Sequence, residues 1–322
     1  MKRIMQIGFF VILVFSIITT GCGTKKAESP SGGGELKGTI TISGAFALYP
    51  LMVRWGEEFQ KLHPDVKFDI SAGGAGKGMT DALNGAVDIG MVSRAIAPEE
   101  EQKGAFWVSA TKDAVFVAVN VKNPVLADIK AKGFSKDVIS KIYITGEITT
   151  WGQVIGKPEI TDPIHVYTRS DSCGAADAFA KYLDKKQEDL LGIGVSGDPG
   201  LLDAVVKDPL GIGFNNLNYA FDANSGLPTT GAFVASLDAN ANGKVDPEEV
   251  FDLKQQAITA IKTGKYPSPP ARDLNLVTKG KPTGLTLAFI SWILTDGQKF
   301  VDEVGYIQLP SEQLTGEINK LK

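Results

Sequence analysis

The sequence predicts an α/β protein with two lobes, and three observations lead to this expectation. Short β-branched or alternating segments, typical of strands, are followed several times by longer segments whose apolar residues recur at helical spacing. Most joints between the two kinds of segment are short and contain glycine or small polar residues. The chain of 322 residues also exceeds the ~250–300 residues at which a single hydrophobic core stops growing.

Strands and helices are expected in alternation along the chain. We expect strands at 39–43, 66–71, 87–94, 114–119, 164–167, 210–214 and 274–278. We expect helices at 51–62, 79–84, 175–183, 198–207, 250–263 and 282–294. The segment 114–119 is almost entirely apolar, which indicates a buried strand that crosses from one lobe into the second.

The composition describes a globular protein with a hydrophobic core and no electrostatic attraction to nucleic acid. Hydrophobic residues make up 43% of the chain, charged residues make up 22%, and the formal net charge is −4. A nucleic-acid partner is therefore not expected. Any anion site must be built locally, because the field of the whole molecule does not attract anions.

The N-terminus is typical of a bacterial export signal. A basic start precedes an apolar run at 7–18, which is too short for a membrane span of ~20 residues. A small residue before Cys22 resembles a lipoprotein processing site, with ordinary cleavage nearby as the alternative. We expect a signal peptide at 1–21, a lipid on Cys22 and a flexible linker at 22–37. The protein would then lie in the cell envelope, anchored on the outer face of the cytoplasmic membrane or in the periplasm, without an internal disulfide, because only Cys173 remains.

The loop that follows the strand 164–167 is the first candidate site. It contains Arg169, short polar residues and Gly174, and it leads directly into a helix. Backbone N–H groups and the positive end of a helix dipole meet at such a joint, and an arginine fork fits two oxygens of a tetrahedral anion. Asp171 has two open interpretations, either an acceptor for a proton of the ligand or a cap of the following helix. Cys173, at the helix start beside Arg169, could have a lowered pKa.

Two other joints have similar chemistry. The glycine-rich segment 72–78 separates the strand 66–71 from the next helix, and glycines there let backbone N–H groups approach a ligand. Its spacing matches neither the dinucleotide fingerprint nor the P-loop. The strand 87–94 ends in Ser93 and Arg94, at the edge where open α/β sheets bind ligands.

Several motifs, in their order along the chain, resemble periplasmic phosphate-binding proteins. They are SGAFALYPL at 43–51, GGAGKG at 73–78, DIGMVSR at 88–94, RSDSCG at 169–174, KGKPTG at 279–284, FI at 289–290, GQK at 297–299 and GY at 305–306. This resemblance implies a two-lobed Venus-flytrap fold with two hinge crossovers. Lobe I would comprise 38–118 and 273–322, and lobe II would comprise 119–272.

The same resemblance implies a monomer that captures an inorganic oxyanion, most of all phosphate, for the permease of an ABC importer. Arg169 matches the anion-binding arginine of the family, Gly174 a backbone donor, and Ser93 a hydroxyl or carboxylate position. The oxyanion-binding residues would be Ala47, Leu48, Ala75, Gly76, Ser93, Arg169, Cys173, Gly174 and Ala175.

The chain departs from the family pattern at several hydroxyl positions. Ala45 and Phe46 stand where serine and threonine are common, Ala75 and Cys173 where serine is usual, and Ala175 where threonine is usual. A buried anion oxygen without a donor costs ~1–3 kcal/mol. Two alternatives therefore stay open, namely another oxyanion such as sulfate, molybdate or tungstate, and a receptor or adhesion protein that retains only the fold.

The segment 238–249 predicts a second site, for calcium. Its spacing fits the twelve-residue loop of an EF-hand, in which Gly243 makes the sharp turn and Val245 is the usual aliphatic residue. The expected ligands are Asp238, Asn240, Asn242, the Lys244 carbonyl, Asp246 and Glu249. We expect a single structural Ca²⁺ that holds the insertion on lobe II, with a polar surface loop as the alternative.

Catalysis and an organic cofactor are not expected. The chain has two histidines, His63 and His165, and neither has serine, cysteine and acidic residues at a spacing typical of a catalytic group. His63 is expected at the end of the helix 51–62 and His165 facing the sheet or solvent.

Overall fold

The computed structural model describes residues 36–322. The predicted signal peptide, the lipidation site Cys22 and nearly all of the linker lie outside these residues. In the described part, no helix combines the length and the apolar character that a membrane crossing requires.

One nine-stranded sheet runs through the molecule in the order β2-β1-β3-β11-β4-β8-β6-β7, with β9 paired to β4. Its strands are β1 Gly38–Gly44, β2 Val66–Ala72, β3 Ile89–Val92, β4 Ala105–Asn120, β6 His165–Arg169, β7 Ile193–Val195, β8 Gly211–Asn216, β9 Ala232–Ala235 and β11 Ala271–Lys279. A separate pair joins β5 Phe134–Ser135 to β10 Leu237–Asp238. The β1–β2, β1–β3, β6–β7 and β6–β8 pairs are parallel, as expected of an α/β protein.

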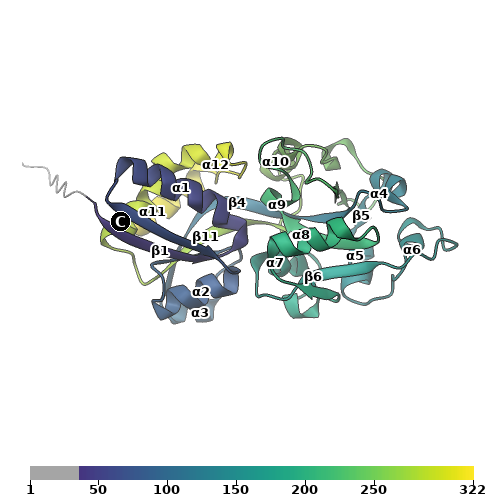
Figure 1. Ribbon diagram of the computed structural model, residues 1–322, viewed down its shortest axis with the longest axis horizontal. Helices are drawn as coiled ribbons and strands as arrows, with labels where there is room; N and C mark the ends of the chain where they lie inside the picture. Colours follow the sequence, from purple (N-terminus) through teal and green to yellow (C-terminus); the bar gives the residue numbers. More distant parts are fainter. Residues whose placement is uncertain (1–35) are drawn as a thin grey trace, which may run out of the picture. The chain divides into compact units, whose positions relative to one another are not determined.

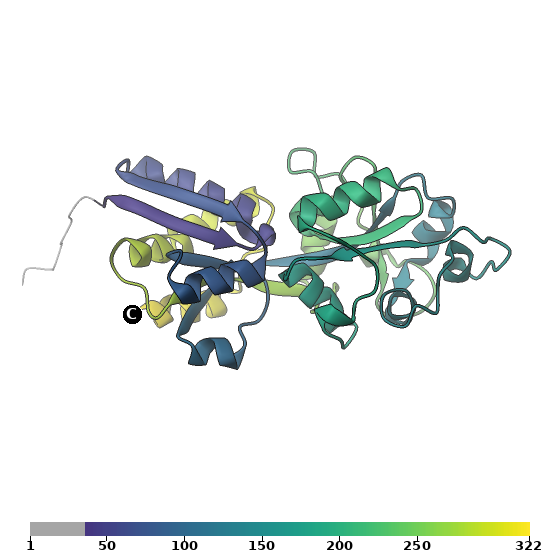
Figure 2. The same ribbon diagram turned by 60° about the horizontal axis from the view of Figure 1, so that its bottom comes forward.

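The strands β4 and β11 join two lobes. The first part of β4 pairs with β11, whereas its last residues pair with β8 and β9. Figure 1 shows the two strands running together between the lobe that contains the purple and yellow segments and the lobe that contains the teal and green segments, and Figure 2 shows the same passage after rotation. The predicted α/β, two-lobed fold with two crossovers is confirmed.

Each lobe has its own helices. Lobe I carries η1 Phe46–Leu48, α1 Tyr49–Leu62, α2 Ala75–Asn84, α3 Pro98–Gln102, α11 Gly284–Leu294, η4 Asp296–Gln298, α12 Lys299–Glu303 and α13 Ser311–Leu321. Lobe II carries α4 Leu126–Lys132, α5 Lys136–Tyr143, α6 Trp151–Ile155, α7 Gly174–Tyr182, η2 Gln187–Asp189, α8 Gly197–Lys207, α9 Leu217–Ala220, η3 Pro247–Glu249 and α10 Lys254–Lys262.

Two hydrophobic clusters form separate cores, one in each lobe. Along β4, Ala110 belongs to the lobe I cluster and Ala114 to that of lobe II. Along β11, Ala271 belongs to lobe II and Leu274 to lobe I. The residue limits that we assign to the lobes stay predictions.

The helix α1 shows how the pattern of apolar residues positions a functional element. Trp55 and Phe59 recur at helical spacing and are at most 1% exposed. The Phe59 ring lies 5.0 Å from the Phe289 ring and 5.4 Å from the Trp292 ring, and burying a side chain of this size contributes about 2 kcal/mol. The helix ends at His63, as predicted. This packing holds α1, which directly follows the segment 45–48, on the core of lobe I.

Three element predictions are wrong in extent. The helix α2 begins at Ala75, four residues earlier than expected, so the glycine-rich segment is partly helical. A Cβ at Gly78 would overlap the Met91 carbonyl oxygen, so this glycine allows close helix–strand packing. The strand β4 begins at 105 and not at 114, because polar residues interrupt its apolar pattern. The helix α10 begins at Lys254, whereas we expect a start at 250.

Candidate functional site

Arg169 lies at the end of β6 and is held by two carboxylates. Its side chain is 1% exposed. Nε and Nη2 donate to the two oxygens of Asp171 at 2.8 and 2.6 Å, and Nη1 donates to Oδ2 of Asp198 at 2.6 Å. These contacts use three of the five N–H donors of a guanidinium. Two N–H donors remain, so the guanidinium can still donate hydrogen bonds to an anion while the two carboxylates hold it in place.

The charges in this cluster depend on one another. Burial disfavours the charge of Arg169, but Asp198 and Asp171 hold its pKa above the ordinary value. Burial alone would raise the pKa of Asp171. Its hydrogen bonds with Arg169 outweigh this effect and hold the pKa of Asp171 below its ordinary value. Two carboxylates facing one guanidinium leave no positive excess. Backbone N–H groups must therefore supply much of the attraction for an anion.

Helix starts provide such N–H groups on both sides of the space between the lobes. In lobe II, α7 begins with Gly174 and Ala175, whose first-turn N–H groups have no carbonyl partner within the helix. In lobe I, α2 begins with Ala75 and Gly76. The Gly76 N–H donates to the Ser172 carbonyl at 3.0 Å, so the two lobes touch at this point.

Ser93 and Gly174 form a second contact between the lobes. Ser93 follows β3, is 2% exposed, and lies so close to Gly174 that a Cβ there would overlap both the carbonyl and the hydroxyl oxygen of Ser93. The Phe46 ring lies over the Arg169 guanidinium with 5.5 Å between the guanidinium carbon and the ring centroid. The Tyr219 hydroxyl donates to the Phe46 carbonyl at 3.3 Å. The structure thus brings together residues 46, 76, 93, 169 and 174, which are distant in the sequence.

The other predicted anion residues lie at helix starts as well, with Ala75 in α2, Ala175 in α7, and Ala47 and Leu48 in η1 directly before α1. Ala47, Leu48, Ala75 and Ala175 are at most 2% exposed. The Leu48 N–H already donates to the Ala45 carbonyl at 3.1 Å. The Cys173 N–H donates to Oε1 of Gln187 at 3.1 Å. Of the predicted set, the amides of Gly174 and Ala175 are therefore better placed as donors than those of Leu48 and Cys173.

Two of the open interpretations for this loop are wrong. Asp171 does not cap α7, because the Cys173 sulfur accepts from the Ala176 N–H at 3.4 Å and occupies the cap position. Asp171 instead accepts from the N–H of Gly197, the first residue of α8, at 3.1 Å. The pKa of Cys173 is not lowered, because burial raises it to about 12, although Arg169 acts against the shift.

Asp198, Asn216 and Arg272 are part of the site but escape prediction from the sequence. Asp198 is 1% exposed, and its Oδ1 accepts from the backbone N–H and the side-chain amide of Asn216 at 3.2 and 2.8 Å. Arg272, on β11, donates through Nε to the Ser93 carbonyl at 2.9 Å. Their only sequence signal is a helix start for Asp198 and a strand end for Asn216, which does not indicate a shared site.

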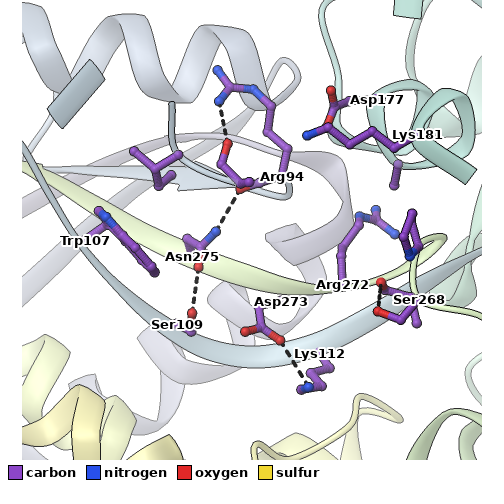
Figure 3. Close-up of a pocket in the computed structure, with 15 residues that line it drawn as sticks. Arg94, Trp107, Ser109, Lys112, Asp177, Lys181, Ser268, Arg272, Asp273 and Asn275 are labelled. Carbon is purple, nitrogen blue, oxygen red and sulfur yellow. Dashed lines mark hydrogen bonds and ion pairs between the residues drawn. The ribbon is translucent and has the colours of Figure 1, made fainter. Parts of the chain in front are cut away.

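A cavity of about 480 Å³ lies beside this site, against the crossover strands. Figure 3 shows Arg94 and Lys181 on one side of the cavity, Lys112 on the other and Arg272 between them. Arg94 pairs with Glu100 at 2.7 Å, Lys112 with Asp273 at 3.4 Å, and Lys181 with Asp177 at 2.9 Å. Because these cations already have carboxylate partners, the cavity is a weaker anion site than the helix starts.

The predicted calcium loop is folded by its own backbone. Asp238 accepts from the N–H groups of Asn242 and Gly243 at 3.0 and 2.8 Å. Glu249 accepts from the N–H groups of Ala239 and Asp246 at 2.9 and 3.1 Å. Gly243 has a φ of 79°, a left-handed conformation that glycine adopts without steric cost and that forms the predicted sharp turn. The first and last predicted ligands are thereby held in place from within twelve residues.

The side chains between them are arranged differently. Asn240 and Asn242 both donate from Nδ2 to Oδ2 of Asp246 at 2.8 Å. Within residues 36–322, no three His, Cys, Asp or Glu side chains gather closely enough to hold a metal ion. Amide and main-chain oxygens would therefore have to complete a calcium site, and the two asparagine amides would have to rotate.

Other predicted positions are accounted for by ordinary contacts. His165 is exposed, as expected, and its Nδ1 lies 2.7 Å from Oδ2 of Asp208. The Val245 N–H donates to the Ala131 carbonyl at 2.9 Å, which connects the loop 238–249 to α4.

Comparisons with known proteins agree with this architecture. The model of the PBP superfamily domain matches residues 29–297. The phosphate-binding protein PstS of Bacillus subtilis (strain 168) is 29% identical over 327 residues, covering 99% of this chain and 99% of that protein.

Two solved structures are similar as well. A candidate phosphate ABC transporter substrate-binding protein with bound phosphate, from Clostridium perfringens, has a TM-score of 0.69 and 26% identity, covering 85% of this chain and all of that one. An ABC-type phosphate transport receptor from Vibrio cholerae has a TM-score of 0.61 at 22% identity, covering 84% of this chain and all of that one, which supports the fold alone.

Proposed function

Because the chain belongs to the PBP superfamily, we propose that it is a solute-binding protein that captures inorganic phosphate for an ABC importer. One observation carries this proposal. The start of α8, the loop before α7 that contains Asp171 and the Phe46 ring of lobe I lie around Arg169, a buried guanidinium with two donors to spare. Backbone N–H groups there can replace the hydroxyls that the sequence lacks at positions 45, 46, 75, 173 and 175. The similarity extends along the whole chain, and it favours phosphate capture over a receptor that retains only the fold.

Three further parts of the proposal concern partners and location. The captured anion passes to the permease of the importer. The two lobes close over the anion, and the permease recognises the protein in this closed, loaded form. Cys22 carries a lipid that anchors the linker 22–37 to the membrane, and the protein acts outside the cytoplasm as a monomer. The basic start, the apolar run at 7–18 and the small residue before Cys22 support the lipid anchor, and the similarity to a phosphate ABC transporter substrate-binding protein supports the importer.

Calorimetric titration of the mature protein tests the anion specificity. Phosphate and arsenate should bind, and sulfate, molybdate and tungstate should bind weakly or not at all. Arg169→Lys should weaken phosphate binding, because an ammonium cannot reproduce the planar fork that the two carboxylates hold. Arg94→Lys is the matched control, since this arginine also forms a bidentate pair, with Glu100, but does not contact Arg169. A protein that binds sulfate or molybdate but not phosphate would contradict the proposal.

We also propose that the loop 238–249 binds one structural Ca²⁺. Asp238, Asn240, Asn242, Asp246 and Glu249 would supply side-chain oxygens and Lys244 its carbonyl, within the 6–8 oxygens that calcium takes. The hydrogen bonds of Asp238 and Glu249 to loop N–H groups support this, because they set the first and last ligands before the ion arrives. The ion would hold the insertion against α4 and β5 of lobe II.

Thermal unfolding in calcium and in chelator tests this second proposal. A loop with a Kd of ~10⁻⁴ M, in about 10 mM calcium, should stabilise the protein by about 2.7 kcal/mol, since the ion binds only the folded state. Glu249→Gln should abolish the increase in Tm. The neighbouring Glu248→Gln should retain it, because Glu248 only lies 3.7 Å from Lys265. Equal Tm values in calcium and in chelator would refute the calcium site.

A further inference from the structure

The crossover strands carry a buried charge pair at their centre. Arg272 on β11 and Asp113 on β4 are directly opposite each other in the sheet register. Their side chains are 8% and 1% exposed, and Nη2 of Arg272 lies 3.6 Å from Oδ2 of Asp113. Burying two charges costs several kcal/mol per ion unless their geometry is excellent. A stabilising role for the pair itself would therefore require close, complete hydrogen bonding.

The pair lacks that bonding. Nη1 of Arg272 and Oδ2 of Asp113 are both buried, and neither has a hydrogen-bond partner. Burial also raises the pKa of Asp113 to about 6, in spite of the nearby charge of Arg272. The pair with Asp113 alone therefore does not explain why a guanidinium stands at this point.

The other contacts of Arg272 reach both halves of the anion site. Nε of Arg272 donates to the Ser93 carbonyl in lobe I at 2.9 Å, and Nη2 donates to Oδ1 of Asn216 in lobe II. The Ser93 carbonyl is the group against which Gly174, the first residue of α7, packs without space for a Cβ. The position of this carbonyl thus sets how closely the two lobes approach.

The contact with Asn216 continues to Arg169. The amide Nδ2 of Asn216 donates to Oδ1 of Asp198 at 2.8 Å, and the other oxygen of Asp198 accepts from Arg169 at 2.6 Å. Asn216 can accept from Arg272 and donate to Asp198 at the same time because an amide has an acceptor end and a donor end. A continuous chain of hydrogen bonds therefore runs from the crossover strand to the predicted anion-binding arginine.

We propose that Arg272 is a positioning residue of the anion site: from β11 it fixes the Ser93 carbonyl of lobe I and, through Asn216 and Asp198, the Arg169 guanidinium of lobe II. This inference rests on the proposed phosphate capture and deepens it. The arginine does not touch the anion. Arg272 thereby couples the distance between the lobes to the orientation of Arg169. When the lobes close, Ser93 and Arg169 reach fixed positions relative to each other.

The first test compares phosphate affinity in three variants. Arg272→Gln should raise the Kd for phosphate about 10-fold or more, equivalent to 1.4 kcal/mol per decade. Arg272→Lys should recover part of this loss, because one ammonium can reach one of the two acceptors. The matched control is Lys112→Gln, which breaks the next cross-strand pair on the same strands, a half-exposed pair with Asp273 at 3.4 Å. That control should change the Kd less than about two-fold.

A double-mutant cycle separates positioning from general loss of stability. If Arg272 acts through Asn216, the effects of Arg272→Gln and Asn216→Ala on the phosphate Kd should be strongly non-additive. Additive effects, or a Kd for Arg272→Gln equal to that of the wild type, would overturn the inference.

Amide hydrogen exchange without phosphate keeps the inference distinct from the proposed function. In Arg272→Gln, amides near Ser93 and in the segment 169–174 should both exchange faster, whereas Lys112→Gln should leave both unchanged. If the wild type binds no phosphate but this exchange pattern appears, the proposed function fails and the positioning role stands. If exchange increases in neither segment or in only one, the positioning role is wrong.

Discussion

The Arg169 site and the loop 238–249 both use carboxylates, but they hold them in different ways. At Arg169, two carboxylates bind one guanidinium. The residues of this cluster come from β6, from the loop after it and from α8, which are distant in the sequence. In the loop 238–249, Asp238 and Glu249 are satisfied by N–H groups of the same twelve residues. The first arrangement depends on the whole fold, whereas the second depends on local chain geometry.

This difference predicts how each region responds to substitution. A buried charge whose partner is removed cannot find another one, so damage at Arg169 should spread through both lobes. In the loop 238–249, the Asp246 side chain is 20% exposed, so water can replace its partners and its substitution should cost less. The four predictions that follow test this contrast, beginning with the largest effect.

Arg169→Gln should cause the largest loss. It leaves Asp171 and Asp198 without their cation, and breaking a buried pair of this kind costs about 3–5 kcal/mol. Chemical denaturation should show that loss, and phosphate binding should disappear. Asp246→Asn in the loop, measured in chelator, should cost far less. Equal losses in the two variants would break the comparison.

Asp198→Asn should have the next largest effect. Asp198 is 1% exposed, and its charge serves Arg169, so its replacement should cost roughly 1–3 kcal/mol by leaving a charged donor without its partner. Asp203→Asn is the control on the same helix, since its pair with Lys207 is mostly exposed and an exposed pair contributes about 0–1 kcal/mol. A similar shift in the denaturation midpoint for both would show that burial does not decide the outcome.

The same contrast explains what the sequence could predict. Strand–helix alternation gave the fold, because apolar spacing such as that of Trp55 and Phe59 is a local property. The turn at Gly243 is also accessible from the sequence, since the hydrogen bonds of this loop join residues fewer than twelve positions apart, whereas the calcium site stays a prediction. By contrast, Asp198 and Arg272 join the anion site only after β4 and β11 bring the two lobes together. No spacing rule connects such residues.

The predicted start of β4 is wrong for a related reason. The polar residues Ser109, Thr111 and Asp113 concealed the first part of β4, because they look like solvent-facing positions in the sequence. In the structure they are at most 2% exposed, and each has a specific partner, such as Asn275 for Ser109 and the Ile307 carbonyl for Thr111. Burial of polar residues that find distant partners cannot be recognised from alternation alone.

Gly174→Ala and Gly243→Ala should separate steric from conformational cost. At Gly174 the added methyl group would meet Ser93 across the space between the lobes, so phosphate affinity should fall because closure is impeded. At Gly243 an added Cβ would meet no other atom within 4 Å, and the cost should come only from a φ of 79°, about 1 kcal/mol. Calorimetry should therefore show weaker phosphate binding for Gly174→Ala and unchanged phosphate binding for Gly243→Ala. Weaker phosphate binding in the second variant would mean that the loop communicates with the anion site.

The smallest effect concerns Cys173, which lies in the Arg169 loop but should be chemically inert. Burial raises the pKa of its thiol to about 12, so almost no thiolate exists at pH 8, and the side chain is 4% exposed. Alkylation by iodoacetamide at pH 8, followed by mass spectrometry, should leave Cys173 unmodified in the native protein and modify it only after denaturation. Cys173→Ser should keep the fold and still cap α7, because a hydroxyl accepts from the Ala176 N–H as the sulfur does. Rapid native alkylation would mean that the charge of Arg169, which lowers the pKa of Cys173, outweighs burial and the neighbouring carboxylates. The charge of Arg169 would then provide most of the attraction for an anion in that loop. The Arg169 site and the loop 238–249 would differ in their electrostatics, and not in whether the partners of their carboxylates are near or distant in the sequence.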